Sequence, residues 1–132
     1  MTSSYLHDRL DAARRGLVRV HKALIDAEQV RYERTHGRID SAGRLLQLVV
    51  NDQAFAWVRP LSSLIVRMDA LLAEAEALDA ADVDALIEHA RRLLRPDADG
   101  QEFPRLYHRA LQESPDVVLA HGAALTRLES VH

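Results

Sequence analysis

The sequence predicts an all-α fold, a helical bundle of four principal helices with one or two additional short helices. Leu and Ala supply 20 residues each of the 132, close to a third of the chain, and both favour helices. Apolar residues recur at spacings of three and four along most of the chain, which is the period of an amphipathic helix. No stretch shows the alternation of polar and apolar residues typical of a half-buried strand. The length predicts a single domain over residues 1–132.

The first helix is expected from about residue 4 to about residue 35. Ser3 or Ser4 caps its start, and Gly37 suits the left-handed residue that ends a helix. At 1.5 Å per residue the helix is roughly 45 Å long, unless Gly16 breaks it and lets the first turns fold back. Its apolar residues follow one another at alternating steps of four and three, a heptad seam on one face: Leu6, Leu10, Ala13, Leu17, Val20, Leu24 and Ala27.

A short, strongly apolar helix is expected next, with Asp40 or Ser41 as its cap. After it, Asp52 caps a turn that carries Phe55 and Trp57. The short helix has at most one narrow polar face, so we expect it deep in the core: its apolar residues are Leu45, Leu46, Leu48, Val49 and Val50.

Three more helices and one short segment follow. Pro60 fits the first turn of a helix over about residues 60–75, because its missing N–H is harmless there. Asp79 opens the next helix, which Pro96 ends. A short helix lies over about residues 103–111, and Ser114 with Pro115 starts the last helix. The expected core, taken from the apolar stripes of these segments, is Leu17, Leu24, Leu46, Val49, Trp57, Leu64, Met68, Leu86, Leu93, Leu111 and Leu125.

Two stretches resemble a family of small bacterial all-helical proteins of no assigned function. They are residues 24–39, LIDAEQVRYERTHGRI, and residues 55–64, FAWVRPLSSL. The resemblance covers about the first half of the chain. It implies a bacterial origin and carries no activity.

The composition excludes several classes of function. Without cysteine the chain offers no disulfide, thiolate zinc site, iron–sulfur cluster or cysteine nucleophile. A net charge of -3 and 5% aromatic residues argue against a nucleic-acid surface. No window approaches the roughly 20 apolar residues of a membrane span, and the charged first residues lack the apolar region of a secretory signal. We expect a cytoplasmic protein that binds neither nucleic acid nor membrane.

The charge is unevenly distributed along the chain. It is +3 over residues 1–50, -6 over residues 51–90 and 0 over residues 91–132. Opposite charges on neighbouring segments predict complementary faces, either inside one fold or across a dimer.

Two Glu-x-x-His pairs raise the hypothesis of a metal site: Glu33 with His36, and Glu129 with His132. Carboxylate-bridged di-iron bundles use two such pairs, placed in the middle of helices with apolar neighbours around them. Here both pairs stand at polar helix ends. We therefore expect solvated side chains, no bound metal and no other cofactor, with these four residues as the remaining metal candidates.

Three residues are candidates for the wall of a pocket. His121 shares a face with Val117 and Leu125, and His21 flanks the heptad seam. A histidine on such a stripe is more often a satisfied core or interface residue than a ligand, although two buried histidines could meet across the bundle. Trp57, the only tryptophan, is expected to be a core anchor or one wall of a ligand pocket.

The sequence predicts a non-enzymatic interaction or regulatory protein with no catalytic residue. The five glycines stand singly, so no phosphate loop or nucleophile elbow is present. The long first helix projects past its neighbours, and burying its apolar overhang against a second copy, or against another protein, is the commonest solution. The alternative is a bundle that binds a metal or a small molecule. The interface candidates for a homodimer are Leu6, Leu10, Ala13 and Leu17.

Overall fold

The structure, a computed structural model, describes residues 3–74 and 78–129. This part of the chain contains helices and no strand, as the apolar spacing predicted. The four principal helices are α1, α4, α5 and α7, and the shorter α2, α3 and α6 complete the fold. Their bounds are α1 (Ser3–His36), α2 (Ala42–Asn51), α3 (Gln53–Ala56), α4 (Arg59–Ala73), α5 (Ala80–Leu93), α6 (Glu102–Glu113) and α7 (Pro115–Leu128). None of these helices is long and apolar enough to cross a membrane.

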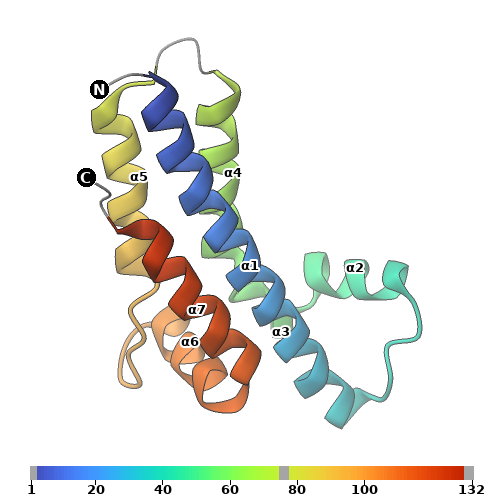
Figure 1. Ribbon diagram of the computed structural model, residues 1–132. Coiled ribbons are helices and arrows are strands. Elements are labelled where there is room, and N and C mark those ends of the chain that lie inside the picture. The colour runs from blue at the N-terminus through green and yellow to red at the C-terminus, as the bar shows by residue number, and fades with distance from the viewer. Residues whose placement is uncertain (1–2, 75–77, 130–132) are drawn as a thin grey trace.

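α1 runs the whole length of the molecule and organises it (Figure 1). α4 and α5 pack along its upper part, and α7, with which it makes its most extensive contact, packs along its middle and lower part. α6 lies across the lower end of this bundle, and the short α3 packs against α1 beside it. The last turns of α1 extend beyond the bundle and lead through residues 37–41 to α2.

Short polar side chains cap four of the helices at positions that the sequence predicted, whereas Ser3 and Ser4, the expected caps of the first helix, lie inside α1. In each case a side-chain oxygen accepts a hydrogen bond from a backbone N–H in the first turn, which satisfies a donor that the helix leaves free. Gly37 has φ 83°, the left-handed conformation that glycine adopts without steric cost, and ends α1 as expected. The capping residues are Ser41 for α2, Asp52 for α3, Asp79 for α5 and Ser114 for α7.

α1 is continuous through Gly16, so the alternative of a break at this residue is wrong. Gly16 faces α7, where a Cβ atom at its position would lie 3.1 Å from Ala124 Cα. The missing side chain lets the two helix backbones approach each other closely. Glycine therefore serves helix packing here and not chain reversal.

The heptad seam of α1 is buried inside the chain itself. Leu6 is 3% exposed, Leu10 0%, Ala13 1% and Leu17 0%, and all four belong to the continuous core. The expectation that these residues supply a dimer interface is therefore wrong, because α4, α5 and α7 already cover them. Other predicted core residues are buried as well: Leu24, Trp57, Leu64, Met68 and Leu86. Leu93 and Leu111 are partly buried against the core.

Leu125 is 39% exposed, so its assignment to the core is wrong. α7 turns small residues toward Gly16 and the rest of α1, which rotates Leu125 outward. The buried face of α7 consists of Val117, Ala120, Ala124 and Leu128.

The prediction that the apolar run at 45–50 lies deep in the core is also wrong. α2 stands away from the bundle as an arm (Figure 1) and buries only Leu48. Leu46 is 64% exposed, and Val49 is only partly buried. The reason is the point of attachment: α2 follows the overhanging end of α1, beyond the helices that cover the seam.

The uneven charge of the sequence produces ion pairs within the fold. Arg9 of α1 pairs with Asp84 of α5, and Arg14 of α1 pairs with Asp69 of α4. The basic first segment and the acidic segment after it are thus complementary faces of one bundle.

Candidate functional site

The overhanging end of α1 carries two candidate surfaces. One is a cleft of about 320 Å³ between the last turns of α1, the α3 region and α6. We call it the Glu28 cleft, after the buried carboxylate that lines it. The other is the uncovered face of α2.

Glu28 is buried, with 4% of the residue exposed. Trp57 donates a hydrogen bond from Nε1 to Glu28 Oε1 over 3.0 Å, and the same oxygen accepts from Arg109 of α6. A buried carboxylate is costly unless it is paired and hydrogen-bonded, and these two donors meet that requirement. Trp57 is itself 4% exposed and lines the cleft, so it is a core anchor and a cleft wall at once.

A second ion pair joins α1 to α6. Nη1 of Arg31 donates to both carboxylate oxygens of Glu113, at 2.9 and 2.8 Å. The side chains are 37% and 38% exposed, so the carboxylate of Glu113 is far more hydrated than that of Glu28, which is 6% exposed, whereas the two arginines are similarly exposed. Arg31 lines the cleft, and therefore two guanidinium groups and one carboxylate face it.

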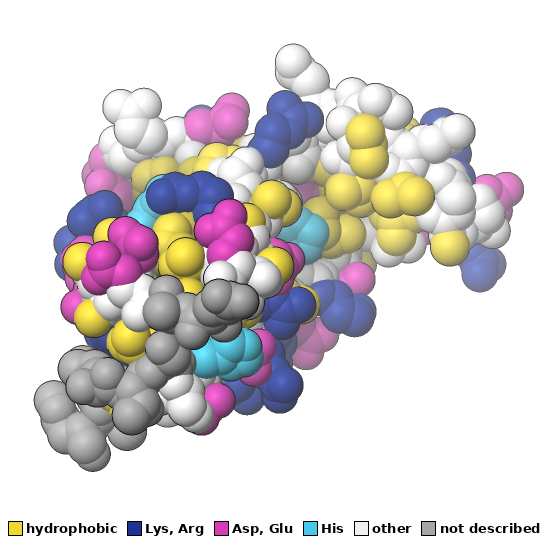
Figure 2. All heavy atoms as spheres, turned by 90° about the horizontal axis from the view of Figure 1, so that it is seen from above, with side chains coloured by type: hydrophobic (Ala, Val, Ile, Leu, Met, Phe, Trp, Pro, Cys, Tyr) yellow, Lys and Arg dark blue, Asp and Glu magenta, His cyan; other side chains and the backbone are white. Residues whose placement is uncertain are grey.

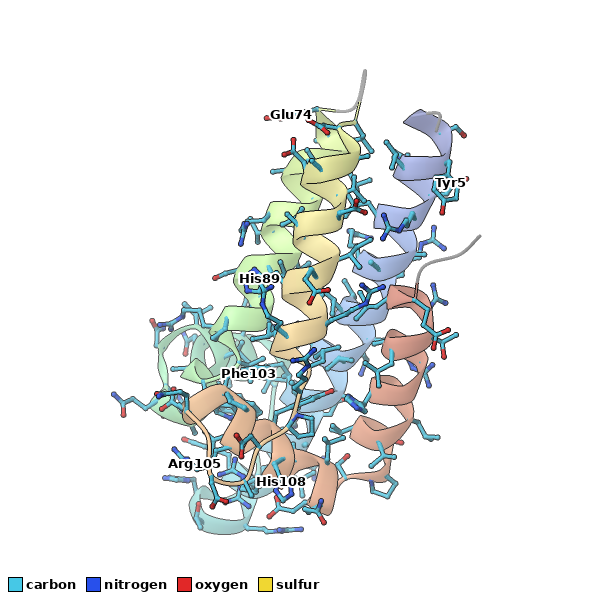
Figure 3. All side chains as sticks on the ribbon, turned by 90° about the vertical axis from the view of Figure 1, so that its left-hand side faces the viewer. Tyr5, Glu74, His89, Phe103, Arg105 and His108 are labelled. Carbon is cyan, nitrogen blue, oxygen red and sulfur yellow. The ribbon has the colours of Figure 1, made fainter. Side chains whose placement is uncertain are left out.

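Aromatic rings form the flat walls around these charges. Tyr32 stacks on His36 with ring centroids 4.2 Å apart and also lines the cleft. The ring centroid of Phe103 lies 5.6 Å from that of Trp57, and the ring of Tyr107 stacks on Phe103. Figure 3 shows Phe103 inside the molecule, whereas Arg105 and His108 lie on the outer side of the same helix.

The two histidines expected in a pocket wall do not line the Glu28 cleft, and they have different partners. His121 Nδ1 lies 2.6 Å from the hydroxyl of Tyr107, and His21 Nε2 lies 2.7 Å from the hydroxyl of Ser62. Burial lowers the pKa of both histidines, so their neutral forms are favoured. The structure gives each histidine its own hydroxyl partner, which is the satisfied-core interpretation.

The Ser62–His21 contact has the distance of a nucleophile and its general base. Catalysis of that type also requires a group that orients the histidine. Among the described residues, no carboxylate hydrogen-bonds His21, and neither residue lines the Glu28 cleft. The contact joins α1 to α4.

The structure uses the described metal candidates in other ways. Glu33 Oε2 accepts a hydrogen bond from the backbone N–H of Ile39 over 2.7 Å, which fixes the loop after α1. His36 is exposed and stacks on Tyr32. Glu129 is exposed, and its expected partner His132 lies outside the described residues. Within residues 3–74 and 78–129, no three metal-binding side chains lie together.

α2 presents an uncovered apolar face, the α2 stripe. It consists of Ala42, Leu45, Leu46, Val49 and Val50, which share one side of the helix by their spacing of three and four. Leu46 and Val50 are the most exposed, at 64% and 58%. Figure 2 shows hydrophobic side chains gathered over this projecting part of the molecule.

No family model, curated protein or solved structure matches this chain. The site is therefore interpreted from its own geometry.

The heptad pattern did not predict that Glu28 is buried, but the sequence contains one signal for it. A straight helix drifts by about 20° per heptad, so after three heptads the buried position moves on by about half a residue. At the end of the seam Glu28 is accordingly buried, while Ala27 is only partly buried. An acid four residues after Leu24 predicts a buried partner, but nothing in the local pattern identifies Arg109.

Proposed function

We propose that this protein is a non-enzymatic interaction protein that works as a homodimer, with the α2 stripe as the contact surface. The observation that carries the proposal is the exposure of Leu46 and Val50 on the side of α2 that the described part of the chain leaves uncovered. Burying a leucine or valine side chain contributes about 1.5 to 3 kcal/mol, so an uncovered stripe favours association.

A second copy of the chain is a suitable partner for this surface. The stripe contains no charged side chain, since Arg44, the only charged residue of α2, lines a cleft toward Tyr32 instead. Two-fold symmetry brings the same surface to both sides of an interface, and two α2 arms packed antiparallel cover each other's apolar residues. A specific interface buries about 1,200 to 2,000 Å² in total, so surface beside the arm contributes the remainder.

Sedimentation equilibrium at micromolar concentration tests the proposal. We expect a species of twice 14.8 kDa for the unmodified protein and a monomer for Leu46→Asp and Val50→Asp. Leu119→Asp and Val66→Asp are matched controls, because these residues are 62% and 65% exposed on α7 and α4. They should leave the dimer intact.

Two results would contradict the proposal. A monomer for the unmodified protein would remove the homodimer. Dissociation by Leu119→Asp with no effect of Leu46→Asp would assign the interface to α7 and reject the α2 stripe. Charges at Leu10 or Leu17 are unsuitable as tests, because both are 0% exposed and their replacement unfolds the bundle.

The proposal includes a bacterial origin and a cytoplasmic location. The first rests on the resemblance of residues 24–39 and 55–64 to small bacterial helical proteins. The second rests on a composition that is 28% charged with a mean hydropathy of -0.19.

A further inference from the structure

The Glu28 cleft contains hydrogen-bond donors that the chain itself uses only in part. Arg109 donates to Glu28 through Nη2; its Nε is buried without a hydrogen-bond partner in the described part of the chain, so a ligand would meet the exposed part of the guanidinium group rather than Nε. Arg31 contacts Glu113 through Nη1 alone, so Nη2 and Nε remain for a second acceptor. A guanidinium group has five N–H donors in a planar fork that matches a carboxylate.

The charge of the cleft favours an anion over a cation. Two guanidinium groups and one carboxylate are among its lining residues. The carboxylate of Glu28 already receives two donors at Oε1, from Trp57 and Arg109. An entering anion meets unused donors, whereas an entering cation meets two arginines of its own sign.

The walls of the cleft favour an anion that carries a planar apolar group, such as a ring. The ring of Tyr32 and the indole of Trp57 both line the cleft, and Leu106 contributes an aliphatic contact. Flat rings pack well against such surfaces. A volume of about 320 Å³ lies at the lower end of the range for small-molecule pockets, which suits a ligand with a single ring.

We propose that the Glu28 cleft binds a small planar organic carboxylate. Its carboxylate group pairs with Arg31 and Arg109, and its ring lies against Tyr32 and Trp57. This inference is independent of the homodimer, because Leu46 and Val50 do not line the cleft. Either proposal can fail alone.

Trp57 makes the test direct, because the only tryptophan of the chain lies in the cleft wall and reports on it by fluorescence. The probe is benzoate, with benzamide as the neutral analogue of the same shape and acetate as the anion without a ring. We expect a saturable change in Trp57 emission with benzoate at a Kd of about 1 mM or tighter, and binding at least about tenfold weaker for both analogues. Equal affinity for benzoate and benzamide, or no saturable change with benzoate, would overturn the proposal.

Two variants distinguish the site from its surroundings. Arg31→Gln should weaken benzoate binding about tenfold, through the loss of a charge-assisted pair. Glu113→Gln removes the competing carboxylate from Arg31 and should tighten binding severalfold, a gain that misfolding cannot imitate. Arg34→Gln is the matched control, since this exposed arginine lies on the same helix outside the cleft and should leave the affinity unchanged. Unchanged binding in both Arg31→Gln and Glu113→Gln would reject the cleft as the site.

Discussion

Leu10 and Leu46 are leucines on apolar faces of neighbouring helices, yet Leu10 is 0% exposed and Leu46 is 64% exposed. Leu10 lies on the part of α1 that α4, α5 and α7 surround. Leu46 lies on α2, which the chain attaches beyond the reach of those helices. The comparison shows that the apolar pattern of a helix does not decide whether the helix is buried. Burial depends on whether other helices of the chain reach that face, as they do at Leu10 and do not at Leu46.

The ion pairs of the two regions differ in their surroundings. On the bundle, Arg9–Asp84 joins α1 to α5. At the overhanging end, Arg31 and Arg109 pair with carboxylates and also line a cleft. Both regions contain a buried guanidinium nitrogen without a hydrogen-bond partner among the described residues, Arg9 Nε and Arg109 Nε, so hydrogen-bond satisfaction does not separate them. The difference is the cleft, and both proposals refer to this end of the molecule because the Glu28 cleft and the α2 stripe lie there.

The largest expected difference between the regions comes from removing apolar side-chain atoms. Leu64→Ala deletes atoms from a residue that is 1% exposed and should lower the free energy of unfolding by about 2 to 5 kcal/mol. Leu46→Ala should change it by no more than about 0.5 kcal/mol. Urea denaturation measures both, at a concentration low enough to keep the chains monomeric. A loss of several kcal/mol for Leu46→Ala would mean that α2 packs on its own bundle.

The bundle could be predicted from the sequence because its determinants are local. The heptad seam, the caps at Asp79 and Ser114 and the glycine at 37 act within one or two turns. The exposure of α2 could not be predicted, because it depends on which helices reach the end of α1. The prediction that Leu125 is buried was wrong for a related reason. Gly16, which faces α7 from α1, decides which side of α7 is buried, and this contact is not local in the sequence.

The candidate site was accessible to prediction only in part. Trp57 was expected as a pocket wall, and it lines the cleft. Its partner Glu28 lies 29 residues away and Arg109 lies 81 residues from Glu28, so no local pattern joins them. The expected histidine and metal residues had recognisable spacings, but the structure assigns them to packing and loop contacts.

The next largest effect should come from the two ion pairs at the cleft. Glu28→Gln removes the charge from a buried acid and leaves Arg109 with a neutral acceptor in place of its carboxylate, so the free energy of unfolding should fall by about 1.5 to 3 kcal/mol. Glu113→Gln alters the exposed pair with Arg31 and should cost less than about 1 kcal/mol. Urea denaturation followed by Trp57 fluorescence gives both values. Equal costs would show that burial does not distinguish the two pairs.

Replacing glycine by alanine should have opposite signs in the two regions. At Gly16 the new Cβ meets Ala124 Cα at 3.1 Å, and we expect this overpacking to outweigh the gain in helix propensity, for a net loss of about 1 kcal/mol. At Gly43 of α2 nothing lies within 4 Å of the added atom, so alanine should stabilise by about 0.5 kcal/mol. Thermal unfolding of the two variants compares them. A stabilising Gly16→Ala would mean that α7 shifts freely on α1.

The smallest expected effect is the pH dependence of the bundle. Burial lowers the pKa of His21 and His121 below the ordinary value of 6.5, so the unfolded chain binds more protons than the folded chain below about pH 6.5. The free energy of unfolding should therefore be fully present above that pH and fall as the pH is lowered through it. Protonated His121 cannot accept the hydrogen bond from Tyr107, which gives the loss a structural cause.

His121→Gln keeps an acceptor but does not titrate, so urea denaturation between pH 7 and pH 5 should show a shallower loss of the free energy of unfolding. His21 and His89 still titrate in this variant and leave a residual slope; the pKa of His89 is lowered by burial and by Arg67. An unchanged slope in His121→Gln would place the acid sensitivity outside the α6–α7 contact.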